Sequence, residues 1–110
     1  MAKKIGFEVG SGNVFRDIGF SEAEAQEAMA KAELIQAIAK TLARRNLTQA
    51  AAAKICQTDQ PTLSRVLRGR MESITIDKLT AWLNALGHNV EIRVSSFRRT
   101  KPGHLLVRAA

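Results

Sequence analysis

The sequence predicts a mainly α-helical domain of about five helices, followed by one short β-strand near the C-terminal end. Apolar residues recur at helical spacing in several segments, residues that favour helix N-caps precede these segments, and the period then changes to two. The chain has 110 residues, of which 45% are hydrophobic. A chain of this length and composition is sufficient for one small domain with its own core.

The first helical signal is a capping box formed by Ser21 and Glu24, so a helix should begin there. A periodic apolar pattern then extends over residues 30–45, and the residues Arg44, Arg45 and Asn46 predict its end. The apolar positions of this pattern are Leu34, Ile35, Ile38, Ala39 and Leu42.

Two short helices are predicted next, over residues 48–56 and 59–69. Thr48 is the expected N-cap of the first, whose four consecutive alanines favour helix and allow another helix to approach closely. Asp59 is the expected N-cap of the second. Pro61 falls in the first turn of that helix, and Gly69 ends it. Its predicted buried face consists of Leu63, Val66 and Leu67.

A further helix over residues 76–86 is predicted to begin after Thr75 and to end at a left-handed Gly87. Its buried stripe is Leu79, Trp82, Leu83 and Leu86. Residues 89–95 then alternate between apolar and polar, which predicts a half-buried strand. Because a single strand is not stable alone, it requires a partner in the N-terminal arm or in a second copy of the protein.

The charge distribution favours a polyanionic partner. The chain carries a net charge of +7, with −2 over residues 1–29 and +9 over residues 30–110. Residues 1–20 are expected to form a flexible arm, residues 21–88 the helical domain, and residues 96–110 a basic tail. The cluster Arg98, Arg99 and Lys101 fits either a solvated tail or an arm that contacts phosphate.

Several function classes are excluded by composition and motif. The single cysteine, Cys56, cannot form an internal disulfide, and with His88 and His104 it cannot complete a zinc site; we expect a buried, inert thiol. No apolar stretch approaches membrane-spanning length, and no signal core follows Met1, so the expected compartment is the cytoplasm. Because no catalytic, metal or nucleotide motif is present, we expect no enzyme, metal or cofactor.

The two short helices are joined by a turn too tight for an antiparallel pair, which is typical of a helix-turn-helix. In that motif the second helix enters the major groove of double-stranded DNA and the start of the first meets the phosphate backbone. Gln60 and Arg65 are the best candidates for reading bases, and a Thr62 methyl suits a thymine methyl. The expected phosphate contacts are Thr48, Gln49, Ser64, Arg68 and Arg70.

Residues 47–54 (LTQAAAAK) and 60–70 (QPTLSRVLRGR) resemble the helix-turn-helix of the XRE/Cro family. The segments VFRDIGF at 14–20, DKL at 77–79 and LG at 86–87 are similar to a bacterial subgroup of this family, so the resemblance covers residues 14–95. The family's turn usually has Gly followed by an apolar residue, whereas this chain has Gln57 and Thr58. Gln57 would therefore adopt a left-handed backbone at some cost.

The resemblance implies a lambda-repressor-like domain of five helices that acts as a dimeric repressor at palindromic operators. It gives a base-reading role to Gln60, to Pro61 or Thr62, and to Arg65, and a phosphate-binding role to Gln49. Several members of the subgroup resemble HigA-like antitoxins, which are encoded beside a RelE/HigB-like ribonuclease toxin.

Three hypotheses follow. The first is a dimeric repressor, in which the strand at 89–95 is a candidate for pairing across the dimer. The second is an antitoxin that autoregulates its operon and uses Glu22, Glu24 and Glu27 against a basic toxin. The third is a helical interaction module whose basic surface is incidental.

Overall fold

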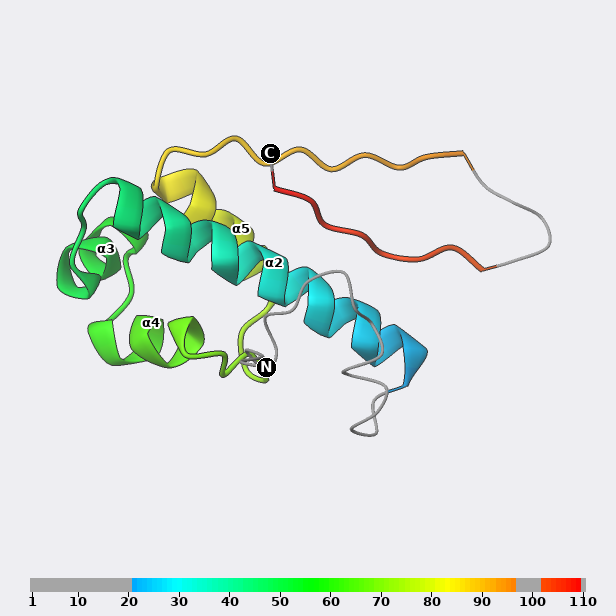
Figure 1. Ribbon diagram of the computed structural model, residues 1–110, viewed down its shortest axis with the longest axis horizontal. Helices are drawn as coiled ribbons and strands as arrows, with labels where there is room; N and C mark the ends of the chain where they lie inside the picture. The colour runs from blue at the N-terminus through cyan, green and yellow to red at the C-terminus, as the bar shows by residue number, and fades with distance from the viewer. Residues whose placement is uncertain (1–20, 97–101, 110) are drawn as a thin grey trace, which may run out of the picture.

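The computed structural model describes residues 21–96 and 102–109, and within them the chain forms four helices. These are α2 (Glu22–Arg44), α3 (Gln49–Cys56), α4 (Gln60–Leu67) and α5 (Ile76–Ala85). Figure 1 shows α2 as a long diagonal helix, with α3 and α4 beside its C-terminal half. None of these helices combines the length and the apolar character that a membrane crossing requires.

The first 23 residues after Ser21 form one continuous helix. The capping box is formed as predicted: Ser21 Oγ accepts from Glu24 N at 3.1 Å, and Ser21 N donates to Glu24 Oε1 at 3.0 Å. No Gly or Pro interrupts the chain from there to Arg44, so the capping box and the later apolar stripe belong to the same 23-residue helix. The described residues therefore contain four helices where the sequence predicted about five.

The other predicted caps are confirmed. Thr48 Oγ1 accepts from Ala51 N at 3.0 Å, Asp59 Oδ1 from Thr62 N at 2.7 Å, and Thr75 Oγ1 from Lys78 N at 3.1 Å. Each bond satisfies an amide that the first turn of a helix leaves without a partner. Glycines with positive φ follow α4 and α5, at Gly69 (96°) and Gly87 (105°). The helix that was predicted to reach Gly69 ends at Leu67.

One apolar core joins the four helices. Its fully buried large side chains are Ile35 and Ile38 from α2, Leu63 from α4 and Leu79 from α5. Each contributes about 1.5–3 kcal/mol by leaving water. Ala39, predicted as a core position, is exposed because it lies at the edge of the α2 stripe. The other predicted core residues, including Trp82 and Cys56, are buried or half-buried as expected.

Polar contacts fix α2 to the loops around α5. Lys31 is buried, and its Nζ donates to Met71 O at 3.1 Å and pairs with Glu27 at 3.3 Å. Arg45 Nη1 donates to Leu86 O at 3.0 Å. The Thr41 hydroxyl donates to the carbonyl of residue 37, so its oxygen accepts from His88 Nε2 at 2.6 Å. These contacts set where the chain leaves the domain after α5.

The predicted strand at 89–95 is not a strand in this structure. Residues 89–96 are extended, but they form no ladder with any described segment. The predicted half-burial is wrong as well, since Ile92 and Val94 are exposed. The alternating pattern is a local property of the sequence, whereas a strand also requires a hydrogen-bonded neighbour. Figure 1 shows this segment extending away from the end of α5.

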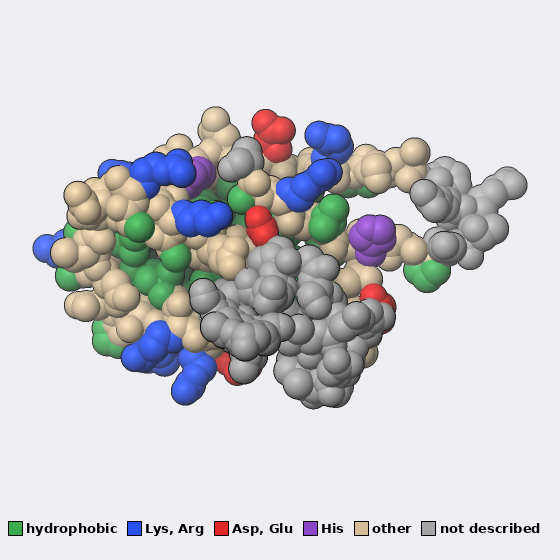
Figure 2. All heavy atoms as spheres, in the orientation of Figure 1, with side chains coloured by type: hydrophobic (Ala, Val, Ile, Leu, Met, Phe, Trp, Pro, Cys, Tyr) green, Lys and Arg blue, Asp and Glu red, His purple; other side chains and the backbone are tan. Residues whose placement is uncertain are grey.

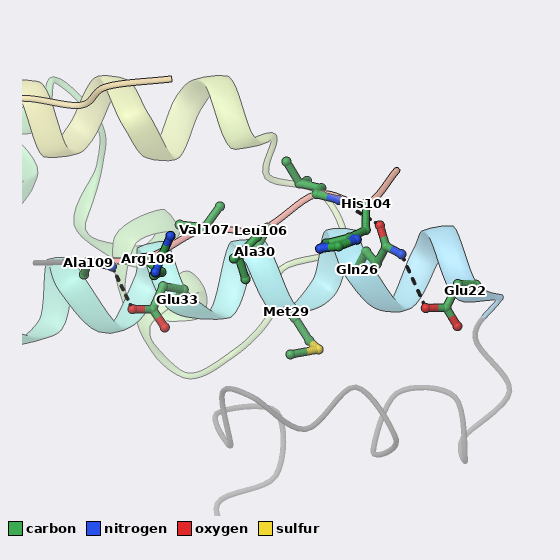
Figure 3. Close-up of a pocket in the computed structure, with 11 residues that line it drawn as sticks. Glu22, Gln26, Met29, Ala30, Glu33, His104, Leu106, Val107, Arg108 and Ala109 are labelled. Atoms are coloured by element: carbon green, nitrogen blue, oxygen red, sulfur yellow. Dashed lines mark hydrogen bonds between the residues drawn. The ribbon is translucent and has the colours of Figure 1, made fainter. Parts of the chain in front are cut away.

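The described part of the predicted basic tail, residues 102–109, returns along α2 (Figures 1 and 3). Leu105 N donates to Gln26 Oε1 at 2.9 Å, and Ala109 N donates to Glu33 Oε2 at 3.1 Å. A groove lies between this segment and α2, lined by Met29, His104 and their neighbours. The predicted arm at 1–20 and the cluster Arg98, Arg99 and Lys101 lie outside the described residues.

Candidate nucleic-acid interface

The turn between α3 and α4 consists of residues 57–59. Gln57 is left-handed, with φ 58° and ψ 45°, as the sequence predicted. Its amide donates to Lys54 O at 3.2 Å, and the Thr58 amide donates to Ala53 O at 2.9 Å, which satisfies carbonyls at the end of α3. Asp59 then caps α4. The connection has the length of a helix-turn-helix turn.

The alanines of α3 set the distance between the two helices. Ala52 and Ala53 are buried in the core cluster together with Leu63 and Val66 of α4. Small side chains at these positions allow the backbones of α3 and α4 to approach closely, as the four-alanine run predicted.

The outward face of α4 carries the predicted base readers. Gln60, Pro61 and Arg65 are exposed, and Thr62 is half-buried. Arg65 Nη2 donates to Thr62 Oγ1 at 3.4 Å, which brings two of these side chains together on one face. The opposite face of the helix is buried, so the polar residues point outward because of the helical period.

The predicted phosphate contacts flank this face. Arg68 and Arg70 are exposed and follow the end of α4, where Gly69 turns the chain. Figure 2 shows basic side chains at the lower edge of the molecule, beside the region that α4 occupies in Figure 1, and further basic side chains along the upper edge. Thr48 and Gln49 lie at the start of α3, and Ser64 is half-buried on α4. The Thr48 oxygen accepts from the helix, which leaves its hydroxyl proton to donate.

Two charged residues at the turn received no DNA-contacting role from the sequence. Lys54 is exposed in the last turn of α3, and its outward position follows from the inward Ala52 and Ala53. The bond from the Thr62 amide, and secondarily the positive charge of Arg65, lower the pKa of the Asp59 carboxyl. Asp59 is thus a carboxylate at neutral pH and places one negative charge at the front of α4.

Not every basic residue contributes to a binding surface. Lys31 is buried against Met71 and Glu27, and Arg45 is bonded to the end of the α5 region through Leu86 O. No group of three or more His, Cys, Asp or Glu residues with the geometry of a metal site occurs in residues 21–96 and 102–109.

Comparison with known proteins agrees with this geometry. A family model described as a helix-turn-helix domain matches residues 14–95. A solved structure whose name describes an XRE family transcriptional regulator superposes with a TM-score of 0.70 and 32% sequence identity, covering 78% of this chain and 98% of that one. The chain belongs to the XRE helix-turn-helix family. A search of curated proteins finds no significant match.

The XRE family explains why α3 and α4 are short while α2 is long. In a helix-turn-helix the two short helices and their turn form the motif, and the surrounding helices bury its apolar faces. Membership of the HigA-like subgroup stays a prediction.

Proposed function

We propose that this XRE protein is a sequence-specific, double-stranded DNA-binding transcriptional regulator that reads the major groove with α4. The observation that carries the proposal is the face of α4, which presents Gln60, Thr62 and Arg65 outward while Leu63 and Val66 hold the helix to the core. A helix fixed in this way can insert into a groove without unfolding or rearranging.

Each outward side chain matches a base edge. The Gln60 amide suits adenine N6 and N7, and the Arg65 guanidinium suits guanine O6 and N7. The Thr62 methyl and the Pro61 ring suit the methyl group of thymine. The 3.4 Å bond between Arg65 and Thr62 would be exchanged for base contacts on binding.

The phosphate contacts would hold α4 in position. Thr48 and Gln49 stand at the N-terminus of α3, where free amides and the helix dipole favour an anion. Ser64, Arg68 and Arg70 supply donors on and after α4. These contacts add affinity and set the register, whereas the base contacts supply specificity.

The proposed mode of action is repression by a dimer bound to a palindromic operator. Two copies would present their α4 helices about 34 Å apart, which matches half-sites one helical turn apart on the same face of DNA. Occupying the operator excludes polymerase, so the proposal requires no catalysis, metal or cofactor and places the protein in the cytoplasm.

The direct test is a selection from random duplex DNA at fixed physiological salt, because phosphate contacts alone produce binding at low salt. We expect an enriched palindrome with half-sites about ten base pairs apart. If no sequence is enriched over the starting pool, the proposal is wrong, and the basic surface belongs to a protein-interaction module.

A pair of variants separates base reading from phosphate binding. Arg65→Ala should relax the preference at one base pair at a cost of about 1–3 kcal/mol, whereas Arg68→Ala should weaken binding to every sequence similarly. Both arginines are exposed and both substitutions remove the same charge, so each variant is the control for the other. If both lose affinity equally on every DNA, the role assignment is wrong.

A second candidate function is that of an antitoxin that also autoregulates its operon. The supporting observation is the acidic start of α2: Glu22, Glu24 and Glu27 are exposed, at the far end of that helix from α3 and α4. A basic RelE/HigB-like toxin could bind there while α4 holds DNA.

The antitoxin function is tested with a purified RelE/HigB-like toxin and the variant Glu22→Gln/Glu24→Gln. Gln retains the capping box at residue 24 while removing the negative charge. We expect the wild-type protein to bind and the variant to bind more weakly, with a smaller dependence on salt. Absence of binding by the wild-type protein would contradict this candidate.

A further inference from the structure

The extended segment 89–96 exposes large apolar side chains to solvent. Ile92 is 87% exposed and Val94 is 90% exposed. The other exposed large hydrophobic residues among those described, Leu105 and Leu106, lie on the neighbouring extended segment, which runs in the opposite direction in Figure 1. Within the described residues, exposed large hydrophobic side chains are therefore confined to these two segments, away from α4.

The segment starts from a fixed point. The His88 amide donates to Leu83 O at 2.9 Å, and its ring is held by Thr41. Val90 is half-buried and packs against the core. With period-two alternation, Val90, Ile92 and Val94 share one face, so an apolar stripe begins at the core and continues beyond it into solvent.

We propose that residues 89–95 pair antiparallel with the same segment of a second copy of this chain, centred on Ile92. The inference rests on the dimeric regulator proposed above and names the surface that forms the dimer. Each strand would supply the hydrogen-bonded neighbour that the other lacks.

Charge complementarity selects the second copy as the partner and sets the register. An antiparallel pair centred on Ile92 places Glu91 of each copy opposite Arg93 of the other. Opposite charges directly across a strand pair are favourable, and like charges are unfavourable. If one strand slides by two residues relative to the other, the pair is centred on residue 91 or on residue 93. The first register places the two Glu91 side chains opposite each other, and the second does the same with the two Arg93 side chains. A parallel, in-register pair would likewise bring like charges together.

The same register also aligns the apolar face. Val90 of one copy lies opposite Val94 of the other, and the two Ile92 side chains meet at the two-fold axis. An odd-numbered slip would place apolar residues opposite charged ones. A two-stranded ribbon alone is marginal in water, so the three apolar residues of each strand must cover one another to stabilise it.

The dimer geometry suits two DNA half-sites. His88 lies four residues from the axis at Ile92, so the two anchoring points are about 26 Å apart along the ribbon at about 3.3 Å per residue. This separation is of the same order as the ~34 Å between half-sites.

The test is the dimer dissociation constant, measured by sedimentation equilibrium at fixed, moderate salt. Glu91→Arg and Arg93→Glu should each weaken the dimer about tenfold or more, since each replaces two attractive pairs by two repulsive ones. A mixture of the two single variants should form a heterodimer of nearly wild-type affinity, because positions 91 and 93 are then both positive in one strand and both negative in the other. The double variant Glu91→Arg/Arg93→Glu should dimerise again by itself.

Both residues are exposed, so the variants should fold normally, which thermal unfolding will check. The inference is overturned if the wild-type protein stays monomeric, if the single variants dimerise like wild type, or if mixing them restores nothing. The variants leave α4 intact, so their binding to a single DNA half-site tests the proposed function separately. Half-site binding by a dimer that the charge changes do not affect refutes only this inference. A wild-type monomer that binds half-sites refutes this inference and the dimeric mode of action, but not DNA reading by α4. A charge-dependent dimer that binds no half-site refutes only the proposed function.

Discussion

Leu63 is the fully buried large side chain of α4, and its truncation tests how that helix is held. It belongs to the core cluster that also contains Ile38 of α2, Ala53 of α3 and Leu79 of α5. If this packing fixes α4 for DNA reading, Leu63→Ala should be strongly destabilising.

The magnitude follows from burial. Leu→Ala substitutions in cores cost about 2–5 kcal/mol, and the cost rises with the volume of the cavity that remains. Leu63 is 0% exposed, and α4 packs against both α2 and α3, so the site can collapse only slightly, and we expect about 3 kcal/mol or more. For a domain of this size, this loss lowers the melting temperature by roughly 12–24 °C.

The assay is urea and thermal unfolding followed by circular dichroism. The matched control is Leu67→Ala, the same substitution one turn later on the same helix, where the side chain is half-buried and the expected cost is about 1–2 kcal/mol. If Leu63→Ala costs no more than Leu67→Ala, α4 is not anchored as the structure indicates.

Three further perturbations test local features. Gln57→Gly should raise the free energy of unfolding by about 1 kcal/mol in urea titrations, because glycine tolerates the left-handed backbone; no gain would contradict the observed φ of 58°. The lowered pKa of Asp59 makes its carboxylate stabilising above the ordinary pKa of 3.8, and this contribution is lost as the pH falls through the lower folded-state pKa. Asp59→Asn, which keeps a good N-cap, should therefore reduce the acid dependence of the urea midpoint, and an unchanged dependence would refute the bond. Burial raises the pKa of the Cys56 thiol, because it disfavours the thiolate. The stability that the protonated thiol contributes is therefore fully present below the ordinary pKa of 9.0, and it is lost as the pH rises through the higher folded-state pKa. A thiol reagent should react with native Cys56 far more slowly than with the urea-unfolded chain, and equal rates would show that the thiol is accessible.

Features that depend on neighbours in sequence could be predicted. The caps Ser21, Thr48, Asp59 and Thr75 are local hydrogen bonds within three residues, so residue type and spacing suffice to find them. The inward and outward faces of α4 follow from the helical period in the same way. The continuity of α2 was not predicted, because its capping box and its apolar stripe were interpreted as separate signals.

Features that depend on distant residues could not be predicted. The alternation at 89–95 indicates extended backbone but not whether a partner strand exists within the chain. The bonds that hold residues 102–109 to Gln26 and Glu33 join positions more than seventy residues apart. Burial of Lys31 likewise removes a basic group that the net charge alone assigns to a binding surface.

The measurement that tests the central claim most directly is the affinity of the variant Gln60→Ala/Arg65→Ala for the selected operator and for a scrambled duplex at the same salt concentration. Specific binding commonly exceeds non-specific binding by about 10³–10⁷. We predict that the variant keeps its fold but loses this preference, while Arg108→Ala, which removes a positive charge from the segment along α2, keeps it. If the double variant still prefers the operator as wild type does, α4 does not read the DNA sequence, and the account is wrong.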